Sequence, residues 1–307
     1  MTGADADEAI ATAQRRRLTR RELARSALLE QLSPEVGVLD EEAVAGALDD
    51  DPDATLGLLS DLTAAADPRL RALARRLAAR VFVDLATAGS ARVTGAGRLA
   101  TLPYRPDRGD LDLDRSSDAI VSAHATRSAI DPEQLRVRGW TTPATAWCLL
   151  VDRSGSMGGR PLATAALAAA AIACRAAPRQ VAVLCFARAV VAVTTLAEHH
   201  DPDAVIDRVL ALRGHGTTGL AGALTAAAAQ LRGAVASRRI TVLLSDCRAT
   251  EPGDVIAAAG AADELVILAP HGDSAQAQDL AAAVDARWAT VAGPSDVVRA
   301  LDAVLRR

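Results

Sequence analysis

Five side chains in three separate segments of this chain offer only oxygen as a possible metal ligand. They are Asp152, Ser154, Ser156, Thr218 and Asp246. Hard cations such as Mg²⁺ and Mn²⁺ are bound by carboxylate, hydroxyl and water oxygens, whereas thiols and imidazoles suit softer metals. The pattern therefore predicts a site for one divalent cation, Mg²⁺ or Mn²⁺, and it assigns no catalytic residue.

The charge of these ligands indicates what the site would bind. Two carboxylates and three neutral hydroxyls leave a divalent cation short of negative charge. A carboxylate from another molecule would be a favoured further ligand, because it adds both an oxygen and a charge. We therefore expect a metal-dependent site that holds an acidic residue of a protein partner.

The elements that carry these residues alternate between strands and helices after Pro143. The expected strands are residues 147–151, 181–186, 189–194, 240–244, 265–268 and 288–291. The expected helices are residues 162–176, 220–235, 252–262, 274–284 and 295–305, with one more beginning after Asp201. The second and third strands are joined too closely for a crossover helix, so they should pair antiparallel. This pattern predicts a doubly wound, mostly parallel α/β sheet.

The fold places the candidate ligands at one edge of the sheet. Ligands of open α/β sheets bind at the carboxyl ends of the strands, where the strand order reverses. Asp152 and Asp246 each follow an expected strand. Gly155 permits a turn that lets Ser154 and Ser156 face the same point, because glycine adopts positive φ without a steric penalty.

These motifs together resemble the von Willebrand factor A domain. They are an apolar strand followed by Asp-x-Ser-x-Ser at 152–156, a threonine before a helix, and a strand followed by Ser245 and Asp246. The resemblance covers roughly residues 144–307. It implies that the five candidate ligands form the metal-ion-dependent adhesion site, or MIDAS, of that family.

Two adjacent threonines compete for one position of this motif. The spacing from the apolar Leu220 and Leu224 favours Thr218 as the ligand, and Thr217 stays open as the alternative.

Cysteine and histidine contribute less to the expected chemistry. Cys247 stands after Asp246 where the family usually has glycine, and we expect its small side chain to pack under the loop. The four cysteines lie mostly in apolar runs without metal-ligand spacing, which indicates buried free thiols. His215 is close to the site in sequence, and a solvated loop histidine is its expected role.

The segment 109–116 resembles one that precedes the A domain in bacterial relatives. These relatives are D-type subunits of magnesium chelatases and A-domain proteins that work with MoxR-type AAA+ ATPases. The resemblance implies a non-enzymatic adaptor that acts with such an ATPase in protein remodelling, complex maturation or metal insertion. A chelatase-like subunit and a Mg²⁺-dependent phosphoester hydrolase are the alternatives. A hydrolase needs a base and groups that clamp the substrate, and only His215 and Arg153 are near the site in sequence.

The tripeptide Arg108-Gly109-Asp110 has two interpretations. It is an ordinary turn, or an exposed Asp110 supplies a carboxylate to a metal within an assembly.

Composition excludes several other functions. All 34 basic residues are arginine, so a lysine of the Walker type and a lysine Schiff base are both absent. A formal net charge of −4 gives no electrostatic reason to expect nucleic-acid binding. Residues 1–13 carry acids where a signal peptide needs an apolar stretch, and no apolar run is long enough for a membrane span. We expect a cytoplasmic protein without a membrane partner.

The chain before the sheet domain is expected to be mainly helical. We expect a helical region over residues 1–100, a linker with a short helix and a strand over 101–143, and the A domain over 144–307. The expected helices are 20–32 capped by Thr19, 41–48 capped by Asp40, 69–86 after Pro68, and 118–125 capped by Ser116 or Ser117. A short strand is expected at 135–138.

Overall fold

The chain forms two compact units. The computed structural model describes residues 17–88, 98–105, 109–141, 145–153, 159–176, 180–196, 198, 201–211 and 217–305. The first unit joins Met1–Ala91 to Thr145–Arg307, and the second is Arg92–Ala144. The helical region therefore belongs to the same unit as the sheet. The boundaries expected at residues 100 and 143 stay a prediction.

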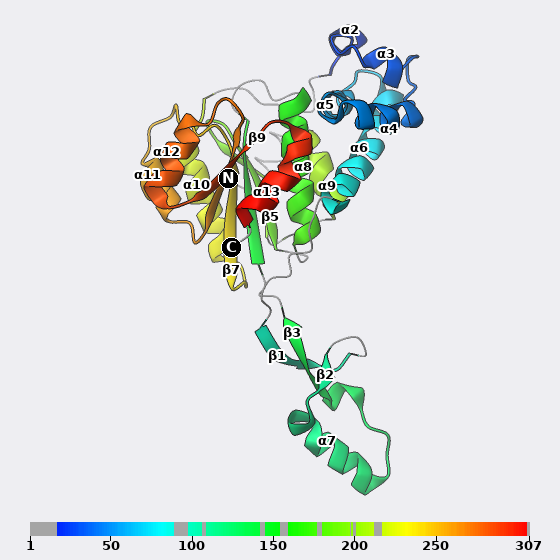
Figure 1. The fold of residues 1–307 in the computed structure, drawn as a ribbon, viewed down its shortest axis with the longest axis vertical. Helices are drawn as coiled ribbons and strands as arrows, with labels where there is room; N and C mark the ends of the chain where they lie inside the picture. The colour runs from blue at the N-terminus through cyan, green and yellow to red at the C-terminus, as the bar shows by residue number, and fades with distance from the viewer. Residues whose placement is uncertain are drawn as a thin grey trace. The chain divides into compact units, whose positions relative to one another are not determined.

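A six-stranded sheet forms the centre of the first unit (Figure 1). Its order is β6-β5-β4-β7-β8-β9, with β4 at Thr145–Asp152, β5 at Val181–Phe186, β6 at Val190–Thr194, β7 at Arg238–Leu244, β8 at Leu265–Pro270 and β9 at Arg287–Val291. Neighbouring strands are parallel except β5 and β6, which pair antiparallel as their short connection predicts. The predicted doubly wound, mostly parallel α/β fold is confirmed.

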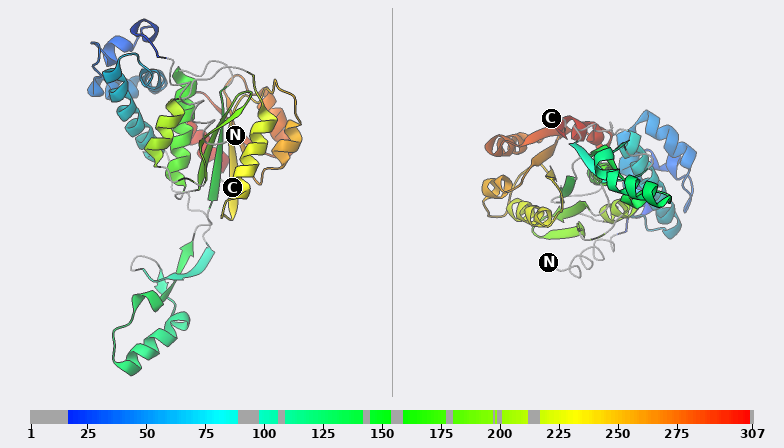
Figure 2. Two further views of the ribbon diagram at one scale, coloured as in Figure 1. Left: turned by 180° about the vertical axis from the view of Figure 1, so that it is seen from behind. Right: turned by 90° about the horizontal axis from the view of Figure 1, so that it is seen from below.

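Helices cover both faces of this sheet (Figure 2). One face carries α8 (Gly159–Arg175), α9 (Pro202–Leu210) and α13 (Val297–Leu305), which follows the short helix η2 (Pro294–Asp296). The other face carries α10 (Leu220–Arg232), α11 (Val255–Gly260) and α12 (Ala275–Val284). Successive residues of β4 serve the two cores in turn, because side chains alternate along a strand. Leu149 and Val151 belong to the core of α8, and Cys148 and Leu150 to the core of α10.

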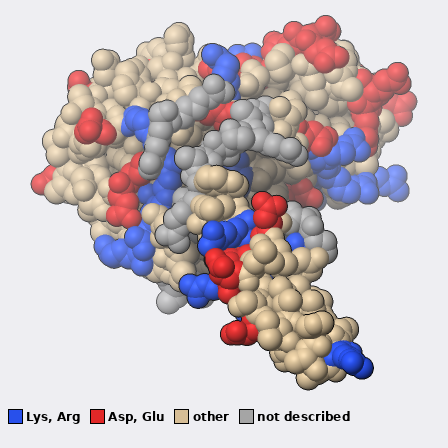
Figure 3. Space-filling view, turned by 60° about the horizontal axis from the view of Figure 1, so that its bottom comes forward, with Lys and Arg blue, Asp and Glu red and all other residues tan. Residues whose placement is uncertain are grey.

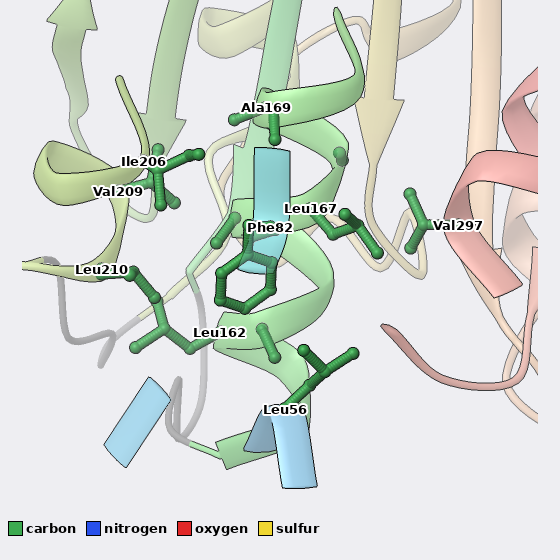
Figure 4. Close-up of a cluster of buried hydrophobic side chains, with 14 of the residues drawn as sticks. Leu56, Phe82, Leu162, Leu167, Ala169, Ile206, Val209, Leu210 and Val297 are labelled. Carbon is green, nitrogen blue, oxygen red and sulfur yellow. The ribbon is translucent and has the colours of Figure 1, made fainter. Parts of the chain in front are cut away.

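The N-terminal helices add a further layer outside α8 and α9. They are α2 (Arg20–Leu23), α3 (Leu29–Leu32), α4 (Glu41–Asp50), α5 (Pro52–Leu62) and α6 (Pro68–Ala88). Leu56 of α5 and Phe82 of α6 are fully buried and lie beside Leu162 and Leu167 of α8 (Figure 4). The helical region and the sheet therefore share one hydrophobic core.

Two details of the helical region differ from expectation. The helix expected over residues 20–32 is two short helices, and the Ser26 side chain accepts a hydrogen bond from the Leu28 N–H between them. Such a bond gives the backbone an alternative to helix continuation. Helix α5 was not expected, although Asp51 caps it and Pro52 occupies its first position.

The second unit holds a small antiparallel sheet and a helix. Its elements are β1 (Arg98–Pro103), β2 (Asp110–Leu111), α7 (Leu113–Thr126), the short helix η1 (Pro132–Gln134) and β3 (Arg136–Thr141), and β3 is the central strand. The expected Ser116 or Ser117 cap for its helix is wrong, because α7 begins earlier and Asp112 caps it. Ser116 is instead buried, and its Oγ accepts from the Arg136 N–H at 3.0 Å. The hydroxyl thus joins α7 to β3.

Within the parts of the chain that the structure describes, we find no helix both long and apolar enough to cross a membrane.

The shared core predicts that the first unit unfolds as one body. Replacing Phe82 with alanine removes a fully buried ring and should lower the free energy of unfolding by about 3–5 kcal/mol. Denaturant curves from far-UV circular dichroism and tryptophan fluorescence should move together. Val235→Ala is the control, because Val235 is 90% exposed. Loss of helical signal well before the fluorescence change would contradict a shared core.

Candidate metal centre

The first candidate ligand stands at the end of the central strand. Asp152 is the last residue of β4, which lies between β5 and β7. The N–H of Arg153 donates to the carbonyl of Phe186 at 2.8 Å, which fixes the backbone directly after Asp152. Ser154 and Ser156 fall in residues 154–158, outside the described residues.

A serine joins the ends of the two central strands. Ser245 follows β7, and its Oγ donates to Oδ2 of Asp152 at 2.6 Å. The next residue is Asp246, whose Oδ1 accepts from the Arg248 N–H at 2.9 Å. The two candidate carboxylates therefore belong to neighbouring strand ends that are joined by a side-chain hydrogen bond. The sequence motif includes Ser245, but its pattern alone did not predict this hydrogen bond to Asp152.

Thr218 is held between two other connections of the sheet. Its side chain is buried, and its N–H donates to Oγ1 of Thr250 at 2.7 Å. Its carbonyl accepts from the N–H groups of Thr250 and Glu251, each at 3.1 Å. The N–H of Gly219 donates to the carbonyl of Ala187 at 2.7 Å. Thr218 is thus fixed by the loops that follow β7 and β5.

Thr217 and Thr218 differ in their surroundings. Thr217 is exposed, and its Oγ1 donates to Oε1 of Glu251 at 2.5 Å. Thr218 is buried, and both its N–H and its carbonyl are hydrogen-bonded to the loop after β7.

Cys247 occupies a backbone position that favours glycine. Its φ is +63°, in the left-handed region that glycine adopts without a steric penalty. Its N–H donates to Oγ of Ser245 at 2.9 Å. Burial, and then the charges of Asp246 and Asp152, raise the pKa of the Cys247 thiol to about 12. Two carboxylates from different strand ends thus act on the same thiol, which agrees with their being close together.

The other cysteines match the expectation of buried free thiols. Cys148 and Cys185 are buried, and Cys174 is half-buried. Burial raises the pKa of all three thiols.

Of the remaining sequence features, His215 lies outside the described residues. Asp110 is exposed at the start of β2 in the second unit. Gly109 before it has a φ of +73°, and a Cβ there would overlap the Arg138 carbonyl. Gly109 and Asp110 therefore lie close against β3, whereas Arg108 is outside the described residues.

The described donors fit a hard divalent cation by their chemistry. Asp152, Thr218 and Asp246 supply carboxylate and hydroxyl oxygens at the carboxyl edge of a parallel sheet. The strand order reverses at β4, where ligands of this fold class bind. The described residues contain no group of three or more His, Cys, Asp or Glu side chains that could hold a metal. Two carboxylates and one hydroxyl fill only part of the shell of about six oxygens that such a cation takes, so further ligands are needed.

Comparison with known proteins gives one family match. The model of the family "VWA domain containing CoxE-like protein" matches residues 73–303. No curated protein sequence gives a significant match.

Several solved structures are similar over about half of the chain. An aerotolerance-related membrane protein from Bacteroides fragilis is 16% identical with a TM-score of 0.42, covering 52% of this chain and 98% of that chain. A von Willebrand factor type A protein from Catenulispora acidiphila is 16% identical with a TM-score of 0.42, covering 53% of this chain and 42% of that chain. Manganese-loaded TRAP protein from Plasmodium vivax is 15% identical with a TM-score of 0.39, covering 48% of this chain and 68% of that chain.

The hydroxyl of Ser245 should contribute measurably to stability. Ser245→Ala removes the donor to Asp152 and the acceptor for the Cys247 N–H, and it should lower the free energy of unfolding by about 1–3 kcal/mol. Ser245→Thr keeps the hydroxyl and should stay near wild type. Urea denaturation of the three proteins measures the difference. Equal stability of the alanine variant and wild type would contradict this role.

Proposed function

Because the chain belongs to the family of VWA domain containing CoxE-like proteins, we propose that it is a metal-dependent protein-binding adaptor. A divalent cation, Mg²⁺ or Mn²⁺, binds at the carboxyl edge of the sheet and takes a carboxylate of the partner as a further ligand. The chain itself carries out no catalysis in this proposal.

The observation that carries this proposal is the joined pair of strand ends. Ser245 directly precedes Asp246, and its hydroxyl donates to Oδ2 of Asp152 at 2.6 Å. The Thr218 backbone is hydrogen-bonded to the loop after β7. These contacts support the proposal that Asp152, Thr218 and Asp246 act together, because they join the ends of β4 and β7 and hold Thr218 against the loop after β7. A cation there would serve as a Lewis acid that binds an anionic oxygen.

The proposed ligands are those of the sequence motif. Asp152, Thr218 and Asp246 are supported by their positions, and Ser154 and Ser156 are proposed from the motif alone. Thr218 is preferred to Thr217, because the Thr217 hydroxyl already donates to Glu251. The site has fewer carboxylates than a full protein cage, so an acidic partner would complete it.

The proposed partner is an acidic protein surface, with a MoxR-type AAA+ ATPase supplying the mechanical work. Adaptor and ATPase would act together in protein remodelling, complex maturation or metal insertion. Nucleic acid is not proposed as a partner. On the face shown in Figure 3, basic and acidic side chains lie interspersed, and the formal net charge is −4. The described residues on that face form no continuous basic surface of the kind that binds nucleic acid.

Metal binding should be weak and should depend on Asp152. Isothermal titration with Mn²⁺ or Mg²⁺ should show one site. Its affinity should be low, because the protein leaves one ligand position to water. Asp152→Ala should abolish the binding while circular dichroism shows an intact fold. Asp263→Ala is the matched control, since Asp263 precedes β8 and is paired with Arg239 on the opposite edge of the sheet. Undiminished metal binding by Asp152→Ala would contradict the assignment of Asp152 as a metal ligand.

Partner binding should require the metal. By reciprocity, a partner carboxylate that ligates the cation must tighten metal binding by the same factor by which the metal tightens partner binding. Affinity capture from native lysate should retain an AAA+ ATPase or its client with Mg²⁺ and lose at least one of them in EDTA. Ser154→Ala and Thr218→Ala should each weaken retention, and Thr217→Ala should have a smaller effect.

Two results would contradict the adaptor. One is identical recovery of partners in Mg²⁺ and EDTA by both wild type and Asp152→Ala. The other is phosphoester hydrolysis by the purified chain that disappears in Asp246→Ala, which would support a hydrolase.

A further inference from the structure

The loop between α3 and α4 carries two exposed apolar side chains. Val36 is 70% exposed and Val38 is 41% exposed. Among the described residues of the first unit, the other exposed large apolar side chains stand singly, Val235 in the loop before β7 and Ile256 in α11. Single apolar side chains are normal on a protein surface, whereas adjacent ones mark interaction sites. The pair of valines therefore indicates an interaction surface on this loop.

Contacts at its base hold this loop in one conformation. The guanidinium of Arg20, in α2, donates to the carbonyl of Ser33 at 2.7 Å and to the carbonyl of Glu35 at 3.4 Å. The Asp40 N–H donates to the carbonyl of Leu32 at 2.9 Å and closes the loop. An ordered loop loses less conformational entropy on binding, so its two valines form a preformed anchor.

Unpaired charges of opposite sign lie on the two sides of the loop. The loop is bonded to α2 through Arg20 on one side and leads into α4 on the other, and α3 lies between these helices in Figure 1. Within the described ranges, the exposed charged side chains without an ion-pair partner include Arg17, Arg21 and Arg25 in or beside α2, and Glu42, Asp49 and Asp50 in α4. The α2 side is therefore basic and the α4 side acidic.

This arrangement of charges is complementary to itself. A two-fold axis through the loop brings the valines of two copies together, and it sets the basic side of each copy against the acidic side of the other. An isologous dimer uses the same patch on both subunits, so its patch must have this property. An anionic membrane or a nucleic acid fits the surface less well, because the acids of α4 would repel it.

We propose that Val36 and Val38 form the centre of a two-fold dimer interface between copies of this chain, with α2 of each copy facing α4 of the other. Apolar contact at the centre supplies affinity, and the charges at the rim set the orientation. The interface lies within the described residues of the helical layer and does not involve the metal centre. It therefore goes beyond the proposed adaptor function and is independent of it.

Sedimentation velocity of the full chain measures the dimer. The wild-type mass should rise from 31.6 kDa toward twice that value as the protein concentration approaches about 100 μM, where an interface of micromolar affinity is populated. Val36→Ser combined with Val38→Ser should weaken the dimer about tenfold or more, because the apolar contact is lost. Val235→Ser is the matched control, since Val235 is an exposed valine outside the helical layer. EDTA should leave the dimer unchanged.

Charge reversal tests the two-fold arrangement. One variant combines Arg21→Glu with Arg25→Glu, so that both sides of the loop are acidic. Another combines Glu42→Arg with Asp49→Arg, so that both sides are basic. Each variant alone should stay monomeric, because its rim charges repel those of a second copy, and an equimolar mixture should form a heterodimer. Far-UV circular dichroism should show an intact fold for both, since all four side chains are exposed.

The valines should also be required in the mixed dimer. Adding Val36→Ser and Val38→Ser to both charge variants should weaken the heterodimer about tenfold or more, which separates the interface from simple attraction between opposite net charges. The inference is overturned if wild type stays monomeric or dissociates in EDTA, or if the serine variant dimerises as tightly as wild type. It is also overturned if either charge variant dimerises alone, if their mixture does not, or if assemblies larger than a dimer form, which indicate head-to-tail contacts.

Discussion

Burial of α8 on nearly its whole circumference is the constraint on which the first unit depends. The sheet packs on one side of this helix, and α5, α6 and α9 pack on its other sides. Its buried residues are mostly alanine, namely Ala163, Ala165, Ala166, Ala168, Ala169, Ala170 and Ala171. A helix that is apolar all round belongs in a core, and alanine lets its neighbours approach closely. Larger side chains here would force neighbouring layers apart.

The same helix links distant parts of the unit mechanically. Its first residue is bonded to Asp61 of α5. Near its last turn, Arg175 pairs with Asp302 of α13 at 2.5 Å, with both side chains about nine-tenths buried. Removal of one partner from such a pair is strongly destabilising, because an uncompensated charge stays buried. The position of α8 is therefore fixed at both ends as well as along its length.

The sheet was predictable because its signals are local. Apolar runs of strand length, each separated by a helical pattern, predict the doubly wound order, and the short connection before Val190 predicts the antiparallel edge strand. Helix α5 lacked such a signal. It is apolar on most sides and contains Gly57, so neither a polar face nor high helix propensity marks it. The sequence feature that indicates where α5 begins is the pair Asp51-Pro52, with Asp51 as the N-cap and Pro52 as the first helical residue.

The metal centre was predictable in part for a related reason. Asp152 and Asp246 follow strands whose carboxyl ends meet at one edge, so sequence order and topology place them together. The supporting contact depends on a pair that no local pattern reveals, because Ser245 reaches a carboxylate 93 residues away. Cys247 is buried, as expected for a small side chain packed under the loop, although its left-handed backbone is one that glycine adopts with less strain.

The Ser295 N–H of η2 donates to Oδ1 of Asp53 in α5 at 2.8 Å, and this bond across 242 residues has a consequence for synthesis in the cell. Ribosomes deliver a chain from its N-terminus, so α5 and α6 emerge before α8 and α9 exist to pack against them and cover Leu56 and Phe82. Apolar faces exposed during translation are prone to aggregate, and contacts of such long range form slowly. The nascent helical layer would therefore be a natural client for a chaperone until the second half of the chain has left the ribosome.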